Sequence, residues 1–270
     1  MNNHMKLAMI LLAAASIGLV GCTKESSVTR APSSSQHNSS IQTNIVNLET
    51  SDIRNVSNAV KEDISQIDVS NIHSLKIQSN AATVTIIGGK QINQAEWELS
   101  KGNSKGMDTK VTTSIKDGTL QINLQQKKKR IINTGPLPSL TIRLPYKDFK
   151  SLEIDNEFGN ISVESELSVQ HLDVSSSAGN ISVTNVIGME SSNISTDLGN
   201  VVFALPDPSA PIYVNLSTQL GNIDNQVPLD KETKTTMVVS NELHGYVGEV
   251  QSESATLNIS TQVGDILFKN

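Results

Sequence analysis

A repeat of alternating apolar and polar positions runs through most of this chain. Seven stretches share one register, and five of them turn at a Gly-Asn or Gly-Asp pair, namely Gly159-Asn160, Gly179-Asn180, Gly199-Asn200, Gly221-Asn222 and Gly264-Asp265. The repeat of about 20 residues is too short for a pair of helices and is rich in alternation. It therefore predicts a parallel β-solenoid, in which coils stack on one another and equivalent residues form columns.

Two aliphatic columns before the turn are expected to face the interior. The position five before the glycine holds Ile77, Ile154, Val174, Ile194, Leu216, Val239 and Ile259, and the position one before it holds Ala81, Phe158, Ala178, Leu198, Leu220, Leu243 and Val263. Apolar residues follow at two and four positions after the glycine. Since side chains alternate along a strand, this arrangement needs a slip of one residue, which a glycine turn permits. We expect Ile154, Val174 and Ile194 to touch in a dry interior.

The first residues have the pattern of an export signal. An apolar run from Leu7 to Val20 follows Lys6 and is too short to span a bilayer comfortably. It ends in Leu19-Val20-Gly21-Cys22, which resembles the lipobox of bacterial lipoproteins and implies cleavage before Cys22 and lipidation of its thiol. The alternative is an ordinary signal peptide with a stray thiol. We expect residues 1–21 to be removed and the protein to be anchored through Cys22, its only cysteine.

Two segments are expected between the anchor and the solenoid. Residues 22–51 are rich in Ser, Asn, Gln and Thr, and they carry too little apolar surface to offset the entropy of ordering, which predicts a flexible tether. Residues 52–71 place Ile53, Val56, Val60, Ile64 and Ile67 at spacings of three and four. This spacing predicts a short amphipathic helix that caps the open end of the solenoid.

The solenoid is expected to occupy residues 72–270, with an excursion at about 90–146. Within the excursion, β-prone segments and the hairpin signal Lys116-Asp117-Gly118 predict hairpins that extend the first coils laterally. Val239 to Leu243 fits the repeat with His244 inserted, so we expect a worn coil there, followed by a last coil from Leu257 to Phe268. A right-handed winding is expected because the six-residue repeat of left-handed helices is missing.

Reactive side chains form no recognisable catalytic constellation. The outward position two before the turn reads Glu157, Ser177, Asp197, Gln219, Glu242 and Gln262, which is typical of a solvated wall. The alternative is a polysaccharide-processing β-helix enzyme with wall carboxylates such as Glu157 and Asp197. The nonapeptide calcium signature is absent, and His73, His171 and His244 have no metal-ligand spacing. We therefore expect no enzyme activity, no metal and no cofactor, and we expect the turn Asn residues to form a structural ladder.

Charge restricts the partners. The chain has a formal net charge of −6, which makes nucleic acid a poor bulk partner. One dense basic run, Lys127-Lys128-Lys129-Arg130, is either a solvated hairpin tip or a contact with anionic lipid or wall polymer beside the anchor.

The chain also resembles the putative-adhesin β-strand-repeat family of bacterial envelope proteins, a family of unknown function. The resemblance rests on the strand pair from Leu75 to Ile86, the segment Leu140 to Pro145 leading into Leu152-Glu153-Ile154, and the Gly-Asn-Ile coils. It implies an adhesin, a scaffold or an envelope-stress sensor, and it supplies no catalytic or binding residues. We therefore expect an extracytoplasmic, lipid-anchored protein that binds an envelope protein or polymer.

Overall fold

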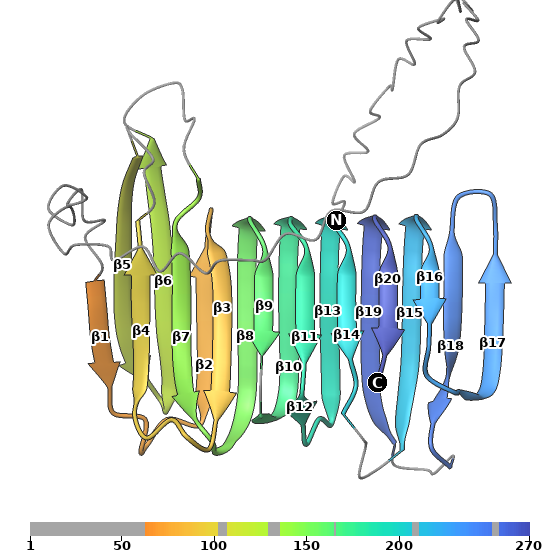
Figure 1. Cartoon of the computed structure of the whole chain (residues 1–270), viewed down its shortest axis with the longest axis horizontal. Helices are drawn as coiled ribbons and strands as arrows, with labels where there is room; N and C mark the ends of the chain where they lie inside the picture. The colour runs from red at the N-terminus through yellow and green to blue at the C-terminus, as the bar shows by residue number, and fades with distance from the viewer. Residues whose placement is uncertain (1–62, 102–106, 129–135, 165, 207–210, 250–253) are drawn as a thin grey trace, which may run out of the picture. The chain divides into compact units, whose positions relative to one another are not determined.

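The chain forms two β-sheets whose inner faces enclose one core (Figure 1). The computed structural model describes residues 63–101, 107–128, 136–164, 166–206, 211–249 and 254–270, and no helix occurs among them. Accordingly, no helix in these ranges is long and apolar enough to cross a membrane. The all-β class predicted from the repeat is confirmed.

Each sheet has a defined strand order. The nine-stranded sheet runs β1 (Asp63–Ile67), β4 (Ala95–Ser100), β7 (Ser139–Pro145), β3 (Thr83–Gly89), β9 (Ile161–Glu164), β11 (Ile181–Thr184), β14 (Val201–Ala204), β20 (Ile266–Lys269) and β16 (Ile223–Asn225). The eleven-stranded sheet runs β17 (Asp230–Thr236), β18 (Asn241–Val247), β15 (Ile212–Leu220), β19 (Ala255–Val263), β13 (Ser191–Leu198), β10 (Leu167–Ala178), β8 (Asp148–Phe158), β2 (Ser74–Ser79), β6 (Thr119–Lys128) and β5 (Met107–Lys116), with β12 (Val186–Ile187) paired to β10.

The predicted coils are present in the middle of the fold. In each coil a long strand of the eleven-stranded sheet passes through a glycine turn into a short strand of the nine-stranded sheet, as β8 does into β9. Ile154 pairs in parallel with Val174, which pairs with Ile194, and each side chain is at most 1% exposed. Burying such a side chain contributes about 1.5–3 kcal/mol. The interior column five residues before the turn is confirmed for these coils.

The coils do not stack in sequence order. The last coil, β19 to β20, lies between the β13–β14 coil and the β15–β16 coil (Figure 1). Ile259 of β19 pairs in parallel with both Ile194 and Leu216. The final aliphatic residues of the chain are therefore covered on both sides, and the coil that precedes them in sequence is displaced outward.

The prediction of a degenerate coil (a worn copy of the repeat) from Val239 to Leu243 is wrong. Residues 241–247 form β18, which is antiparallel to β15 and forms a hairpin with β17. Leu243, not Val239, packs beside Leu216, whereas Val239 lies in the exposed hairpin turn. An antiparallel strand at this position pairs the open side of β15 without needing a partner strand in the other sheet.

The excursion at residues 90–146 extends both sheets at the opposite end, as predicted. β6 and β7 add in parallel to β2 and β3, while β5 and β4 add antiparallel strands beyond them. The hairpin signal is confirmed, because Asp117 and Gly118 both adopt positive φ, at 48° and 68°, between β5 and β6. These angles match the primed turn that suits the twist of a hairpin.

The capping helix predicted at 52–71 is wrong where it can be compared. Asp63–Ile67 forms β1, which pairs antiparallel with β4 at the edge of the nine-stranded sheet, and residues 52–62 lie outside the described ranges. The open sheet edge offers backbone hydrogen bonds that override the weak helical spacing of Ile64 and Ile67. The described residues belong to one compact unit, Asn55–Asn270.

The glycine turns line up along one edge of the fold, which we call the turn edge. A Cβ on Gly179 would lie 2.1 Å from the carbonyl oxygen of Gly159, so only glycine allows this approach. The next residue builds the predicted ladder: the side-chain oxygen of Asn160 accepts a hydrogen bond from the backbone N–H of Asn180 (3.0 Å). The ladder continues through Asn200, Asp265 and Asn222 in the spatial order of the coils. Asp265 fits because the ladder needs only an acceptor oxygen.

The second predicted interior column is wrong. Phe158, Leu198 and Leu220, one position before the turn glycine, are 54%, 55% and 56% exposed. The last inward residue lies two positions earlier, where the hydroxyl of Thr196 donates to the carbonyl of Gly179 (3.1 Å). Equivalent bonds run from Thr261 and Thr218 to the glycine carbonyls of their neighbouring coils. The slip of one residue thus occurs before the glycine and turns the aliphatic position outward.

Candidate binding surface

The outward side chains of the eleven-stranded sheet form rows across its parallel strands, and we call this face the polar wall. In-register pairing places equivalent residues about 4.8 Å apart. One row contains Glu153, Asp173, Asn193, Asn258 and Asn215, and the next contains Asp155, Ser175, Ser195, Ser260 and Ser217. The third row is the predicted outward column with Glu157, Ser177, Asp197, Gln262 and Gln219.

Hydrogen bonds link neighbouring side chains along these rows. The amide of Asn258 donates to Asn193 Oδ1 (3.0 Å), and the amide of Gln262 donates to Asp197 Oδ1 (2.7 Å). In the middle row, Ser175 Oγ donates to Asp155 Oδ1 (3.2 Å). These bonds order part of the wall, because the side chains that make them are held by a neighbour as well as by their strand.

Charge gathers at one end of the wall. Glu153, Asp155 and Asp173 lie on β8 and β10, and Lys76 of β2 forms an ion pair with Glu153. The pKa of Asp173 is raised above its usual value, first by partial burial and then by the negative charges of Glu153 and Asp155, while Lys76 opposes the shift. The other end of the wall is mostly Asn, Ser and Gln and offers neutral hydrogen-bonding groups.

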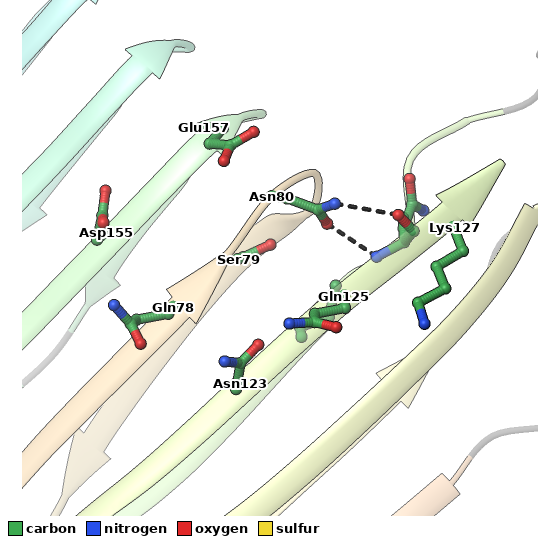
Figure 2. Close-up of a pocket in the computed structure, with 10 residues that line it drawn as sticks. Gln78, Ser79, Asn80, Asn123, Gln125, Lys127, Asp155 and Glu157 are labelled. Atoms are coloured by element: carbon green, nitrogen blue, oxygen red, sulfur yellow. Dashed lines mark hydrogen bonds between the residues drawn. The ribbon is translucent and has the colours of Figure 1, made fainter.

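A hollow of about 410 Å³ interrupts the wall at its charged end, as Figure 2 shows. It exists because β2 ends at Ser79, whereas its neighbours β8 and β6 continue to Phe158 and Lys128. The amides of Gln78, Asn123 and Gln125 line it, with carboxylates on one side and an ammonium on the other, namely Asp155, Glu157 and Lys127. This arrangement can hold a polar group through amide and charged contacts.

The rim of this hollow is fixed by the turn after β2. Asn80 Nδ2 donates to the carbonyl of Gln126 (3.0 Å), and Gln126 N–H donates to Asn80 Oδ1 (2.8 Å), as drawn in Figure 2. The side-chain amide of Gln126 is buried beside the hollow and has no hydrogen-bond partner among the described residues. An unpaired buried amide is destabilising, and both of its polar atoms are shielded from solvent.

A second hollow of about 280 Å³ lies at the neutral end of the wall. Ser195, Ser260 and Ser217 of three adjacent strands form its floor, and the longer side chains of Asp197, Gln262, Gln219 and Glu242 surround it. The depression follows from side-chain size, since a row of serines lies beside a row of longer residues. Its lining consists of hydroxyl, amide and carboxylate groups.

The residues singled out from the sequence lie apart. Cys22, Lys129 and Arg130 lie outside the described residues, and β6 ends at Lys128 beside the exposed Lys127. Glu157 and Asp197 are exposed on β8 and β13, with β10 between them. His73, His171 and His244 lie at the start of β2, on β10 and on β18, and no cluster of three or more His, Cys, Asp or Glu side chains within the described ranges could hold a metal ion.

Sequence reasoning found only one row of the wall. The rows of Asn193 and Ser195 were not singled out, although they lie four and two residues before the identified row and the same alternation places them outward. Neither hollow could be found in this way, because one depends on where β2 ends relative to β6, and the other on the insertion of β19 between β13 and β15.

Comparison with known proteins relates the chain to a family and a fold. The family profile described as Toastrack DUF4097 matches residues 72–266. A structure described as a putative cell adhesion protein from Clostridium sporogenes ATCC 15579 aligns with a TM-score of 0.55 at 16% identity, over 77% of this chain and 98% of that chain. At that identity, the likeness shows the fold alone.

Two further structures are more distant. A putative adhesin from Parabacteroides merdae ATCC 43184 has a TM-score of 0.36 at 13% identity, over 77% of this chain and 81% of that one. A putative adhesin from Bacteroides fragilis NCTC 9343 has a TM-score of 0.29 at 12% identity, over 77% of this chain and 97% of that one. Neither carries an argument at such a score. No curated protein matched the sequence.

Proposed function

Because this chain belongs to the Toastrack DUF4097 family, whose profile spans most of its length, we propose that it is a non-catalytic binding protein of the cell envelope. Its polar wall contacts another macromolecule, which is either an envelope protein or a wall polymer. The proposal includes the anchoring of the protein outside the cytoplasm through a lipid on Cys22.

One observation carries the binding proposal: the polar wall repeats the same hydrogen-bonding groups from strand to strand. The Ser175, Ser195, Ser260 and Ser217 row and the Asn193, Asn258 and Asn215 row repeat at about the 4.8 Å strand spacing. An extended partner can therefore make the same contact several times, and several weak contacts made together add up to a stable one. A binding surface of this kind suits an adhesin or scaffold, and equally a sensor that holds a membrane signalling protein by contact.

Site-specific photo-crosslinking in intact cells tests this proposal. A photoreactive residue at Ser217, in the second hollow, should give a discrete high-mass adduct. The matched control is Ser182, a half-buried serine on β11, which belongs to the nine-stranded sheet. Equal adducts at both positions, or none at Ser217, would contradict binding through the wall. Glycan cleavage by the purified protein, lost in Glu157→Gln, would instead support the polysaccharide-processing alternative.

The lipid anchor has its own test. The sequence Leu19-Val20-Gly21-Cys22 supports it, and residues 22–51 would serve as the tether after removal of residues 1–21. We expect the wild-type protein to incorporate a labelled fatty acid and to sediment with membranes, and Cys22→Ser to lose the label and to sediment with membranes to a much smaller extent. Membrane sedimentation of Cys22→Ser equal to that of the wild type would contradict anchoring at this residue.

Two finer elements belong to the same proposal. The basic run from Lys127 to Arg130 would contact anionic lipid or polymer, at about 1 kcal/mol per basic residue near such a surface. If the protein restrains a membrane stress sensor, deletion of the gene should change the output of an envelope-stress reporter, and unchanged output would remove this regulatory role.

Right-handed winding of the coils stays a prediction.

A further inference from the structure

Exposed apolar side chains form a row along the turn edge, with the smaller Ala178 between Phe158 and Leu198. Ala178 pairs with both Phe158 and Leu198, and Val263 pairs with both Leu198 and Leu220, so the side chains follow one another from strand to strand. Phe158, Leu198 and Leu220 are more than half exposed, and Val263 is 43% exposed. These four residues, with the hairpin tip described next, are called the apolar rim.

The hairpin between β17 and β18 continues the row. Its tip consists of Met237, Val238 and Val239, each more than half exposed, and Val238 is fully exposed. Asn241 Nδ2 donates to the carbonyl of Gly221 (2.7 Å), which holds the tip beside the end of β15. The turn between β17 and β18 extends past the ends of the neighbouring coils (Figure 1).

Exposed apolar side chains concentrate at this edge. Among the described residues, eleven large apolar side chains are exposed, and eight of them are Leu137, Phe158, Leu198, Leu220, Met237, Val238, Val239 and Val263. Leu137 adjoins the rim, since its Cδ1 lies 3.0 Å from the place of a Cβ on Gly159. The strand ladders and the Asn160 ladder hold the coils without these side chains. Such a contiguous apolar patch on a protein surface marks a site of interaction with protein or membrane.

The chain enters the fold at the same edge. β1 is antiparallel to β4, which is antiparallel to β7, so β1 runs in the same direction as the strands that leave the glycine turns. Asp63 is therefore the end of β1 nearest the turn edge, and the chain that connects it to Cys22 arrives there. The tether proposed for residues 22–51 would link this edge to the lipid on Cys22 and keep it close to the bilayer.

The exposed side chain of Lys127 lies on the same edge. β6 runs toward the turn edge and ends at Lys128, next to the exposed Lys127. Lysines near an anionic bilayer surface add to the attraction. The apolar rim, the entry of the tethered chain and the end of β6 thus share one side of the molecule.

We propose that the apolar rim inserts into the interfacial layer of the bilayer that carries the lipid anchor. This inference rests on the proposed lipidation of Cys22. The rim is one side chain wide, so a second copy of the chain would bury far less than the roughly 800 Å² per partner of a stable protein interface. A fluid bilayer needs no complementary shape and accommodates both the row and the projecting tip. The polar wall then stands upright on the membrane and faces the envelope.

A fluorescent probe on the rim tests the proposal. In the lipidated full chain Cys22 carries a thioether, so Leu198→Cys introduces a single free thiol for an environment-sensitive fluorophore. The protein is reconstituted in vesicles of phosphatidylethanolamine and phosphatidylglycerol. We expect a blue-shifted emission that lipid-attached quenchers suppress. The matched control, Ser195→Cys on the same strand, points to the polar wall and should report water.

The outcomes separate the rim from the anchor. Identical, water-like spectra at the two positions would overturn the proposal. A blue-shifted emission at Leu198→Cys that lipid quenchers do not suppress and that grows with protein concentration would also overturn it, because it would indicate contact with a second copy of the chain. Labelling of wild-type protein at Cys22 would show instead that lipidation, and not the rim, is the failed premise.

A second measurement removes the lipid. Cys22→Ser is titrated with the same vesicles, with and without the added pair Leu198→Ser and Leu220→Ser. Because each leucine adds about half of its surface to the contact, the pair should lower the partition coefficient at least about tenfold. Equal partition of the two forms, including no binding by either, would overturn the inference. Both leucines are exposed, so the circular dichroism spectrum should be unchanged.

Discussion

Two aliphatic columns cross the same coils four residues apart, and their environments are opposite. Ile154, Val174 and Ile194 are at most 1% exposed, whereas Phe158 and Leu198, in the second column, are more than half exposed. Both columns repeat with the coils and both consist of apolar residues, although the second includes the smaller Ala178. The comparison teaches that regular apolar spacing identifies a column, while the side it faces depends on how the backbone turns before the glycine.

The strongest test of the difference is a truncation in the buried column. Ile194→Ala should lower the free energy of unfolding by about 4 kcal/mol, because it removes buried surface and leaves a cavity between two coils. Urea unfolding followed by circular dichroism measures this. The matched change in the exposed column, Leu198→Ala, should cost a small fraction of that amount. Similar losses at both positions would contradict the assignment of the two environments.

The glycine stack that separates the columns gives the next effect. Gly199→Ala should cost about 3 kcal/mol, since its Cβ would lie 2.1 Å from the carbonyl oxygen of Gly179 and the coils would have to move apart. Thermal unfolding of the purified protein provides the measurement. Gly89→Ala serves as the control, because a Cβ there meets its nearest neighbour, Ile92 Cδ1, at 4.0 Å. An unchanged melting temperature for Gly199→Ala would show that the turns do not limit the spacing between coils.

The hydroxyls beneath the turn give a smaller effect. Thr261 is 4% exposed, and its hydroxyl donates to the carbonyl of Gly199 (3.0 Å). Thr261→Val keeps the shape and leaves that carbonyl without this donor, which should cost about 1–2 kcal/mol in urea unfolding. Ser260→Ala, on the polar wall next to it, should be nearly neutral. A larger loss of stability for Ser260→Ala than for Thr261→Val would mean that contacts on the polar wall, and not the buried hydroxyls, stabilise the turn.

A pH-dependent effect comes from the polar wall. The raised pKa of Asp173 means that its charged form is disfavoured in the folded protein. Its charge therefore lowers the stability of the fold as the pH rises above the usual pKa of 3.8, and this loss is absent at low pH. Asp173→Asn should therefore raise the melting temperature slightly at pH 7 and leave it unchanged near pH 3. The effect is small because solvent screens the exposed carboxylate. A larger difference at pH 3 than at pH 7 would contradict this sign.

The smallest stability effect is expected on the rim itself. Leu198→Ser should change the free energy of unfolding by less than about 0.5 kcal/mol, as is usual for exposed positions. Ile194→Ser, a serine substitution four residues earlier in β13, should prevent folding or nearly do so. Chemical denaturation of both variants checks the pair. A costly Leu198→Ser would show that the rim is covered by another part of the folded chain.

Local pattern determined the coils because strand alternation acts over a few residues. The positions of Ile154, Val174 and Ile194 and the glycine turns follow from neighbours within one repeat, and the Asn160 ladder follows from stacking identical turns. The hairpin at Asp117-Gly118 followed for the same reason, since its turn chemistry is local. The outward rows of the polar wall could be predicted by the same count, although only one of them was identified in advance.

Tertiary structure decided the features that depend on which strand lies beside which. Ile259 fits equally well in register beside Ile194 or Leu216, because every coil presents the same column, so the sequence alone does not place the last coil between them. The open edge beside β4 turned Asp63–Ile67 into a strand, against its helical spacing. Leu198 is exposed because the regular pairing is interrupted between Thr196 and Leu198, where the Thr196 hydroxyl donates to the carbonyl of Gly179 in the next coil. Repeating patterns determine what each coil is, and only contacts between coils determine their order and the side that each column faces.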